Sequence, residues 1–267
     1  MASIYTHNKF GLDLIDKLNP TLKDISTKYN SYYLLGQQGP DFLFFNPKLF
    51  IKKNAPGNYI HAQSFKSFLD LNKVYLKSQN LSSPLMAYLL GATCHFILDS
   101  KIHPTVNSLA EKQFSHQDIE SELDRYFLLI DENDPITFHL ENLIPRDKTI
   151  FKNVYPLYKK YKNINYNDFL KSMEDFYKWK KFFHTETLRK EKIILNTMSL
   201  FKVKNIIGGQ IIRQTPFDQA YNSNKILSET FTSALNAAPK LLENALDYIY
   251  NDAPLYSEFF MNYNGIK

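Results

Sequence analysis

Apolar residues recur along most of the chain at the three- and four-residue spacing of one helix face. This spacing predicts helices over residues 61–76, 83–102, 116–130, 149–161, 166–184, 185–204 and 223–250. A further helical pattern covers residues 10–25, where Pro20 must kink or break the helix. Only residues 136–140 suggest the alternation of a short strand, so the sequence predicts an all-α, multi-helix bundle.

Residues 29–60 interrupt the helical pattern. They hold most of the early glycines and prolines, namely Gly36, Gly39, Pro40, Pro47, Pro56 and Gly57. Such a segment predicts a long irregular connection. Long connections inside a compact domain are often functional, so we expect site residues there.

The length and composition of the chain are those of a single domain. A chain of 267 residues with 44% hydrophobic content can bury one sizeable core, so we expect a single domain over residues 1–267. The net charge of +5 is compatible with an anionic substrate or a membrane surface and selects neither. The single cysteine, Cys94, excludes an internal disulfide and is expected to be a packed thiol. With no leader-like segment and no apolar run long enough to span a bilayer, we expect a cytoplasmic protein.

The densest cluster of ligand-type residues begins at His95. His95 and Asp99 are four residues apart, so on a helix they lie one turn apart on one face and can share a cation. Pro104 disfavours the helical conformation of the residue before it. The helix is therefore expected to end near His103, which leaves that imidazole able to serve a different metal.

A second pair follows at His116 and Glu120. Ser115 and Asp118 form a capping-box pattern, which predicts that a helix begins at His116. His103, His116 and Glu120 would give three protein ligands and leave a fourth position for water, as in catalytic zinc sites. A lone pair of this kind is usually a surface or capping pair, and a lone apolar-run histidine is usually structural. Spacing alone leaves metal binding and these ordinary roles both open.

The order of these residues resembles the bacterial zinc-dependent phospholipase C family, whose fold is shared by fungal single-strand-specific nucleases. The family pattern is matched by His7, Asp41, His61, His95, Asp99, His103, His116 and Glu120. The resemblance covers a metal-ligand half, residues 1–125, and leaves a helical remainder, residues 126–267. His139 and His184 match no position of the pattern and are expected to be structural or surface residues.

The resemblance implies two or three zinc ions with a division of ligands. One ion would be held by Asp41, His61, His95 and Asp99, a second by His103, His116 and Glu120, and a third by His7, Asp99 and the N-terminal residue. In relatives, removal of a signal peptide commonly exposes an N-terminal tryptophan. This sequence shows neither that tryptophan nor a signal-like segment. Removal of Met1 would make Ala2 the terminal ligand.

Such a site would suit a phosphodiester, because bound zinc polarises phosphate oxygens and supplies hydroxide at neutral pH. Asp41 is implied either to orient or deprotonate the attacking water or to act only as a ligand. Four aromatic residues flank the ligands and are either core residues or a substrate wall: Phe42, Phe44, Tyr59 and Phe65.

Three functions follow from this pattern. The leading prediction is a phospholipase C-like phosphodiesterase acting on phospholipids, and the runner-up is a nuclease or other phosphodiesterase on the same scaffold. The third is a metal-stabilised binding module without activity. Basic and aromatic residues at 158–162 give nucleic acid a weak case, and those at 178–181, around Trp179, indicate a solvated helix face or a membrane-surface contact. The sequence does not indicate an oligomeric state.

Overall fold

The computed structural model describes residues 3–50, 55–161 and 164–267. Its α-helices are α1 Ile4–Ile15, α2 Pro20–Lys28, α3 Asn30–Gly36, α4 Pro47–Phe50, α5 Pro56–Ala62, α6 Phe65–Lys77, α7 Pro84–Leu109, α8 His116–Ile130, α9 Lys148–Val154, α10 Tyr166–Phe183, α11 Leu188–Leu200, α12 Lys204–Ile207 and α13 Ala220–Tyr250. Short 3-10 helices lie at Asp41–Phe44 (η1), Leu140–Leu143 (η2), Tyr155–Leu157 (η3), Gly208–Gln210 (η4) and Ser257–Phe260 (η5). The described residues form no strand, only an isolated bridge between Glu111 and Phe114, so the all-α prediction is confirmed.

Local sequence signals set several helix ends. The hydroxyl of Ser115 accepts the backbone N–H of Asp118, and the Asp118 carboxylate accepts the backbone N–H of Ser115, which makes the predicted capping box and starts α8 at His116. The pattern over residues 10–25 is divided between α1 and α2 by Asn19 and Pro20. The Asn19 side chain accepts the backbone N–H of Leu22, and Pro20 occupies the first helical position, where its missing N–H costs nothing.

Two sequence-based expectations for irregular or extended segments are wrong. The connection over residues 29–60 contains α3 and α5, because apolar residues such as Tyr33, Leu35 and Ile60 pack into the core and favour helical turns there. Residues 136–140 form turns that lead into η2 rather than a strand. The Asp134 carboxylate accepts the backbone N–H of Ile136 and holds the chain in that turn.

The expected end of α7 near His103 is also wrong, because the helix continues through Pro104 to Leu109. Nearly every residue of α7 before Pro104 is buried, and Val106 after it is buried as well. Packing on all sides therefore outweighs the lost backbone hydrogen bond of the proline. The missing hydrogen bond is the one that residue 104 would donate to the backbone oxygen of Ser100. Gly265 lies against that oxygen, so closely that a Cβ on Gly265 would be 2.4 Å from it.

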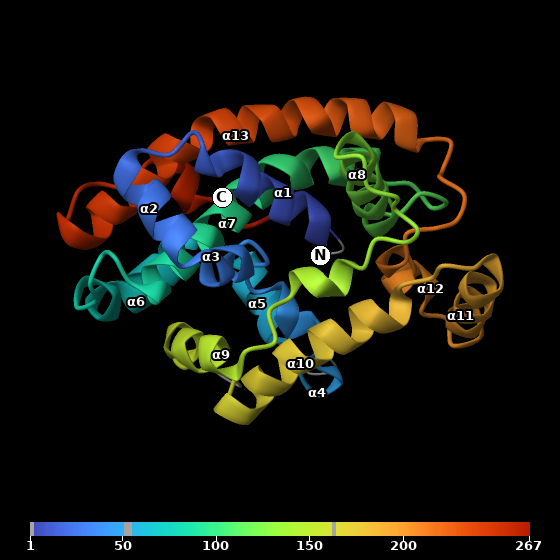
Figure 1. The fold of residues 1–267 in the computed structure, drawn as a ribbon, viewed down its shortest axis with the longest axis horizontal. Coiled ribbons are helices and arrows are strands. Elements are labelled where there is room, and N and C mark those ends of the chain that lie inside the picture. Colours follow the sequence, from blue (N-terminus) through green and yellow to red (C-terminus); the bar gives the residue numbers. More distant parts are fainter. Residues whose placement is uncertain (1–2, 51–54, 162–163) are drawn as a thin grey trace.

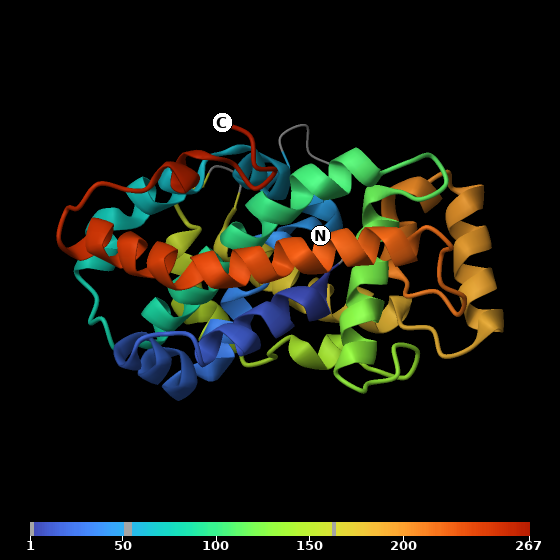
Figure 2. The same cartoon turned by 90° about the horizontal axis from the view of Figure 1, so that it is seen from above.

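The helices are arranged around α7. Helix α13 runs lengthwise over one side of the bundle, and α10 lies on the opposite side (Figures 1 and 2). Helix α3 crosses α7 at two glycines: a Cβ on Gly36 would lie 2.3 Å from the Tyr88 oxygen, and one on Gly91 would lie 2.0 Å from the Tyr33 oxygen. This close approach brings the segment after α3, which includes Asp41, against the buried face of α7.

One large apolar core joins α1, α3, α6, α7, α8, α10 and α13. A second, small cluster lies around α11, at one end of the molecule, and consists of Phe183, Ile194, Leu195, Met198 and Ile211 (Figure 1). Cys94 is fully buried beside the Tyr33 hydroxyl, as expected for a packed thiol. Among the helices of the described residues, none has the length and apolar character needed to traverse a lipid bilayer.

Candidate metal centre

Helix α7 presents three ligand-type side chains on successive turns. Because α7 does not end at Pro104, His95, Asp99 and His103 share one face of a continuous helix. The Asp99 carboxylate lies between the two imidazoles, with Oδ2 3.2 Å from His95 Nε2 and Oδ1 3.5 Å from His103 Nε2. His103 therefore does not turn away from Asp99 as the sequence suggested, and Asp99 is placed to bridge two groups of ligands.

Helix α8 contributes the second pair. Glu120 Oε1 lies 3.3 Å from His103 Nε2 and 3.4 Å from His116 Nε2, so one carboxylate oxygen faces both imidazoles. The ligand atoms of His103, His116 and Glu120 all lie within 4.8 Å of one another. The structure thus brings together the three residues that the sequence placed in one site.

Two ligands come from the segment between α3 and α6. Asp41 begins η1, and His61 lies in the last turn of α5. Asp41 Oδ1 is 2.9 Å from His61 Nε2 and 3.8 Å from His95 Nε2. Gly39 makes this arrangement possible, because its φ of +48° suits glycine and a Cβ there would lie 2.2 Å from the His95 ring.

His7 reaches the same place from α1. Its Nε2 is 3.1 Å from Asp99 Oδ1, and its ring stacks on that of His95 at 4.2 Å. The start of α1 is held by the buried Asp124 of α8, which accepts the backbone N–H groups of Tyr5 and Thr6 and the Thr6 hydroxyl. A carboxylate from another helix therefore caps α1 and fixes the position of His7.

The other four imidazoles are oriented by a hydrogen bond at Nδ1. His61 Nδ1 pairs with the Gly57 oxygen at 2.8 Å, His95 Nδ1 with the Gln37 oxygen at 3.0 Å, and His103 Nδ1 with the Tyr263 oxygen at 2.8 Å. His116 Nδ1 pairs with Asn107 Oδ1 at 2.8 Å. An acceptor at Nδ1 places the proton there and leaves the Nε2 lone pair for a cation, as is usual for metal-bound histidine.

The buried polar atoms of the site fit zinc. His61 Nε2, His95 Nε2 and Asp99 Oδ2 are buried and have no hydrogen-bond partner among the described residues, although each lies near another ligand atom. Burial would raise the pKa of the Asp99 carboxyl, but the charges of His103 and His95 hold it well below the usual range. The site therefore brings imidazole nitrogens and ionised carboxylates together, the donor set that zinc takes in proteins. We call the eight side chains the metal centre: His7, Asp41, His61, His95, Asp99, His103, His116 and Glu120.

Tyr263 is a site residue that the sequence did not indicate. Its backbone oxygen orients His103, and its backbone N–H donates to the His61 oxygen at 3.3 Å. Its ring, which is 3% exposed, packs against His61 with centroids 4.7 Å apart. One residue thus joins two ligands of the metal centre, and it lies 160 positions after His103, where no local spacing connects them.

Lys180 is a second unexpected site residue. The sequence placed it within an exposed basic cluster, yet it is 3% exposed, whereas Lys178 and Lys181 face solvent. Burial lowers its pKa to about 8, and the negative charges of Asp124, Asp41 and Glu120 oppose this shift. A buried cation in the field of two ligand carboxylates contributes positive potential to the metal centre.

The four aromatic candidates for a substrate wall separate into two pairs. Phe42 and Phe65 have no exposed surface and pack in the core, against Phe169 and Phe96 respectively. Phe44 is half-buried with its ring 5.0 Å from His61, and Tyr59 is 53% exposed near Tyr161. Only Phe44 and Tyr59 offer surface to a ligand. Ala2, the expected N-terminal ligand, lies outside the described residues.

Comparison with known families agrees with this geometry. The family model described as zinc dependent phospholipase C matches residues 6–179, which extends well past the residues 1–125 that the sequence pattern covered. Comparisons with curated proteins and with solved structures gave no match. The matched segment spans more than half of the chain and includes all eight residues of the metal centre. The chain therefore belongs to the zinc-dependent phospholipase C family.

Proposed function

We propose that the protein is a zinc-dependent phosphodiesterase that cleaves phospholipids on the glycerol side of the phosphodiester. Family membership supports zinc-dependent phospholipase C chemistry and a phospholipid substrate. The observation that carries the proposal is the orientation of the imidazoles. Four histidines give Nδ1 to an oxygen acceptor and direct Nε2 toward the carboxylates of the metal centre.

The chain's own residues prepare the site for an anionic phosphate. When bound, zinc acts as a Lewis acid on the phosphate and lowers the pKa of water towards neutrality. Three carboxylates face five imidazoles, so two or three divalent ions would leave the pocket positively charged. Lys180 adds to that potential, which favours the charge that builds on phosphate oxygens in the transition state.

Asp41 is the proposed catalytic residue. It belongs to a short 3-10 helix in the segment between α3 and α6, and its carboxylate faces His61 and His95. Burial would raise the pKa of its carboxyl, but the pKa is lowered overall, and the hydrogen bond from His61 and the charge of His95 contribute to this, so the carboxylate is ionised. An ionised Asp41 can orient the attacking water and accept its proton, in addition to acting as a ligand.

We propose a third ion at His7 and Asp99, completed by the amino group of Ala2 after removal of Met1. His7, His95 and Asp99 form a group with ligand atoms within 4.8 Å of one another, which supports a site there. Zinc content measured on processed protein and on protein with an N-terminal tag tests this step. Equal zinc content and equal activity in the two forms would contradict it.

The structure weakens the case for nucleic acid as the substrate. Of the aromatic residues in the basic stretch 158–162, Tyr158 is 1% exposed and hydrogen-bonds to Tyr88, so it cannot stack on a base. Lys162 lies outside the described residues. Phe44, whose ring lies beside His61, and the exposed Tyr59 remain as the proposed wall for an acyl–glycerol moiety. Membrane-surface contact and a cytoplasmic location stay predictions.

A paired substrate assay tests the proposal. Zinc-loaded protein is incubated in parallel with phospholipid vesicles, single-stranded DNA and single-stranded RNA. We expect diacylglycerol and a phosphorylated head group from the vesicles. Cleavage of nucleic acid without lipid turnover would instead support the nuclease alternative. No turnover by fully metal-loaded protein would support the binding-module alternative.

A further inference from the structure

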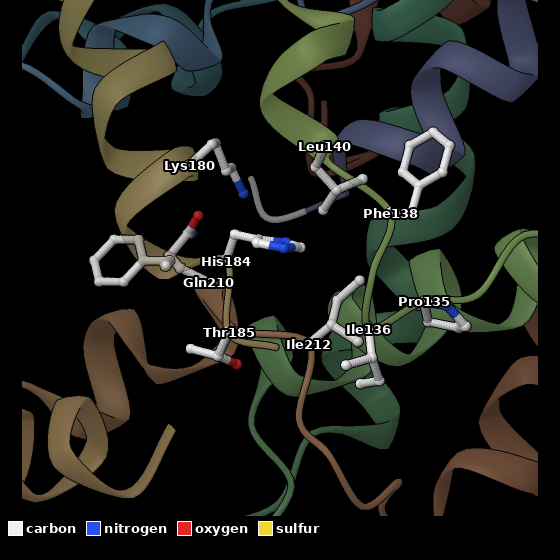
Figure 3. A pocket seen from close by; sticks show the side chains of 10 residues that line it. Pro135, Ile136, Phe138, Leu140, Lys180, His184, Thr185, Gln210 and Ile212 are labelled. Carbon is white, nitrogen blue, oxygen red and sulfur yellow. The ribbon is translucent and has the colours of Figure 1, made fainter. Parts of the chain in front are cut away.

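A second histidine cluster lies outside the metal centre, between the connection that follows α8 and the corner between α10 and α11. We call it the rim cluster and define it as His139, Glu141, His184 and Glu186. His139 precedes η2 and Glu141 lies in it, whereas His184 ends α10 and Glu186 lies before α11. Figure 3 shows the His184 ring extending from the end of α10 towards Leu140, in the same cavity that Lys180 lines.

The ligand atoms of this cluster converge. His184 Nε2 lies 3.0 Å and His139 Nε2 lies 3.7 Å from the same atom, Glu186 Oε1. The two imidazole rings stack at 4.3 Å, and the ligand atoms of the three residues all lie within 4.8 Å of one another. Ligands about 2.0 Å from a tetrahedral zinc lie roughly 3.3 Å apart, so small side-chain rotations would close the cluster around an ion.

A buried carboxylate gives independent evidence for an ion. Glu141 is 3% exposed, and its Oε1 accepts from His139 Nδ1 at 2.9 Å. Its other oxygen, Oε2, is buried without a hydrogen-bond partner among the described residues. A carboxylate that holds Nδ1 in this way directs the Nε2 lone pair outward and makes it a stronger metal ligand. Burying Glu141 without a cation nearby would be costly.

His139 is paired with Glu141 through Nδ1, and its Nε2 and that of His184 both lie near one oxygen of Glu186. One cation between His139, His184 and Glu186 would satisfy all three ligand atoms at once. Two imidazoles and a carboxylate suit zinc better than calcium or magnesium, which prefer oxygen ligands.

We propose that the rim cluster is a second, separate zinc site, with His139, His184 and Glu186 as ligands and Glu141 orienting His139. The ion ties the connection after α8 to the corner between α10 and α11. His184 and Glu186 lie beyond residues 6–179, so half of the site is contributed by a part of the chain outside the family match. Its open side leaves a fourth position for water, since His139 and Glu186 are 47% and 53% exposed.

Zinc stoichiometry tests the proposal independently of enzymatic activity. The double variant His139→Ala/His184→Ala and the single variant Glu186→Gln are compared with wild-type protein by elemental analysis at a fixed free zinc concentration. Glu229→Gln is the matched control, because Glu229 is exposed on α13 and far from the cluster in sequence. We expect the double variant to bind one zinc equivalent fewer and Glu186→Gln to lose that equivalent at lower chelator concentration than wild type.

The outcomes are distinct from those of the proposed function. The double variant should keep its far-UV spectrum and its phosphodiesterase turnover, whereas His95→Ala should keep the rim zinc and lose turnover. Should the double variant not fold, Glu186→Gln alone decides the question, since it removes only an exposed side chain. Equal zinc content and equal chelator resistance in Glu186→Gln, Glu229→Gln and wild type would overturn the proposal.

Discussion

The metal centre and the rim cluster both combine histidine with carboxylate, but they differ in what orients the imidazoles. In the metal centre, His61, His95 and His103 give Nδ1 to the backbone oxygens of Gly57, Gln37 and Tyr263 respectively. In the rim cluster, His139 gives Nδ1 to the side chain of Glu141. The fold brings these backbone oxygens into position, and replacing a side chain does not remove them. The orientation of these three imidazoles therefore depends on the fold itself, whereas that of His139 can be removed by replacing one side chain.

The sharpest contrast should come from removing one ligand of each site. We expect His95→Ala to lower phosphodiesterase turnover by more than about 1,000-fold, since loss of a ligand should exceed the 10- to 100-fold effect of losing an orienting partner. His184→Ala should leave turnover near the wild-type level. Steady-state rates and circular dichroism on both variants check this. If His95→Ala loses fold and metal together, the metals are chiefly structural.

The backbone's part in the metal centre is tested at Gly39. A side chain there must adopt a positive φ and would overlap the His95 ring, so we expect Gly39→Ala to lower the free energy of unfolding by roughly 2–4 kcal/mol and to reduce zinc content. Gly208→Ala is the control, because Gly208 has a helical φ of −63° and a Cβ there meets nothing closer than 3.5 Å. Denaturant unfolding should show Gly208→Ala unchanged or more stable by about 0.4–1 kcal/mol. Equal losses in the two variants would refute the steric argument.

One ligand of the metal centre is oriented by a side chain, as in the rim cluster. Asn107 is exposed and accepts from His116 Nδ1, so Asn107→Ala should leave the fold intact and weaken zinc at His103, His116 and Glu120 by about 10- to 100-fold. Asn107→Asp keeps the acceptor and serves as the control. Competition with a chelator measures the affinity. Unchanged affinity in Asn107→Ala would mean that the fold alone holds His116.

The last prediction concerns Lys180, which lines a cavity with His184 and lies in the field of Asp41 and Glu120, and its effect appears only at alkaline pH. Its folded pKa of about 8 is below that of an unfolded lysine, so between pH 8 and pH 10.5 the unfolded chain binds a proton that the folded chain does not. Its contribution to the free energy of unfolding should therefore rise with pH across that window, by up to about 1.4 kcal/mol per pH unit. The difference between wild type and Lys180→Met isolates this slope. Lys181→Met, at an exposed neighbour, is the control for removing one lysine from α10.

The sequence predicted which ligand-type side chains lie close together better than it predicted where the helices around them end. Pairs four residues apart, such as His95 with Asp99 and His116 with Glu120, share a helix face by local geometry, which holds in any tertiary context. The end of α7 could not be predicted from Pro104, because burial on all sides of the helix outweighs the local preference of the proline. The prediction that Lys180 lies on an exposed helix face was wrong for a related reason. A lysine among lysines carries no local signal that it faces three buried carboxylates.

Long-range partners were beyond local patterns altogether. Nothing near His7 indicates that Asp124 will cap its helix, and nothing near His103 indicates Tyr263. The convergence of the rim cluster was not predicted either, for a different reason. His139, His184 and Glu186 are separated in sequence and follow no regular spacing, so only the packing of η2 against α10 brings them together.

Tyr263 hydrogen-bonds to both His61 and His103, and this contact has a consequence for metal loading while the chain is being synthesised. All eight ligands have been translated once residue 120 is made, but the oxygen that orients His103 comes 143 positions later, from residue 120 to residue 263. At 5–20 residues per second, this leaves an interval of roughly 7–30 s in which the His103 imidazole lacks the acceptor that orients it. Premature metal capture in the wrong pairing is a hazard during that interval, and correct loading should follow the arrival of the last segment rather than precede it.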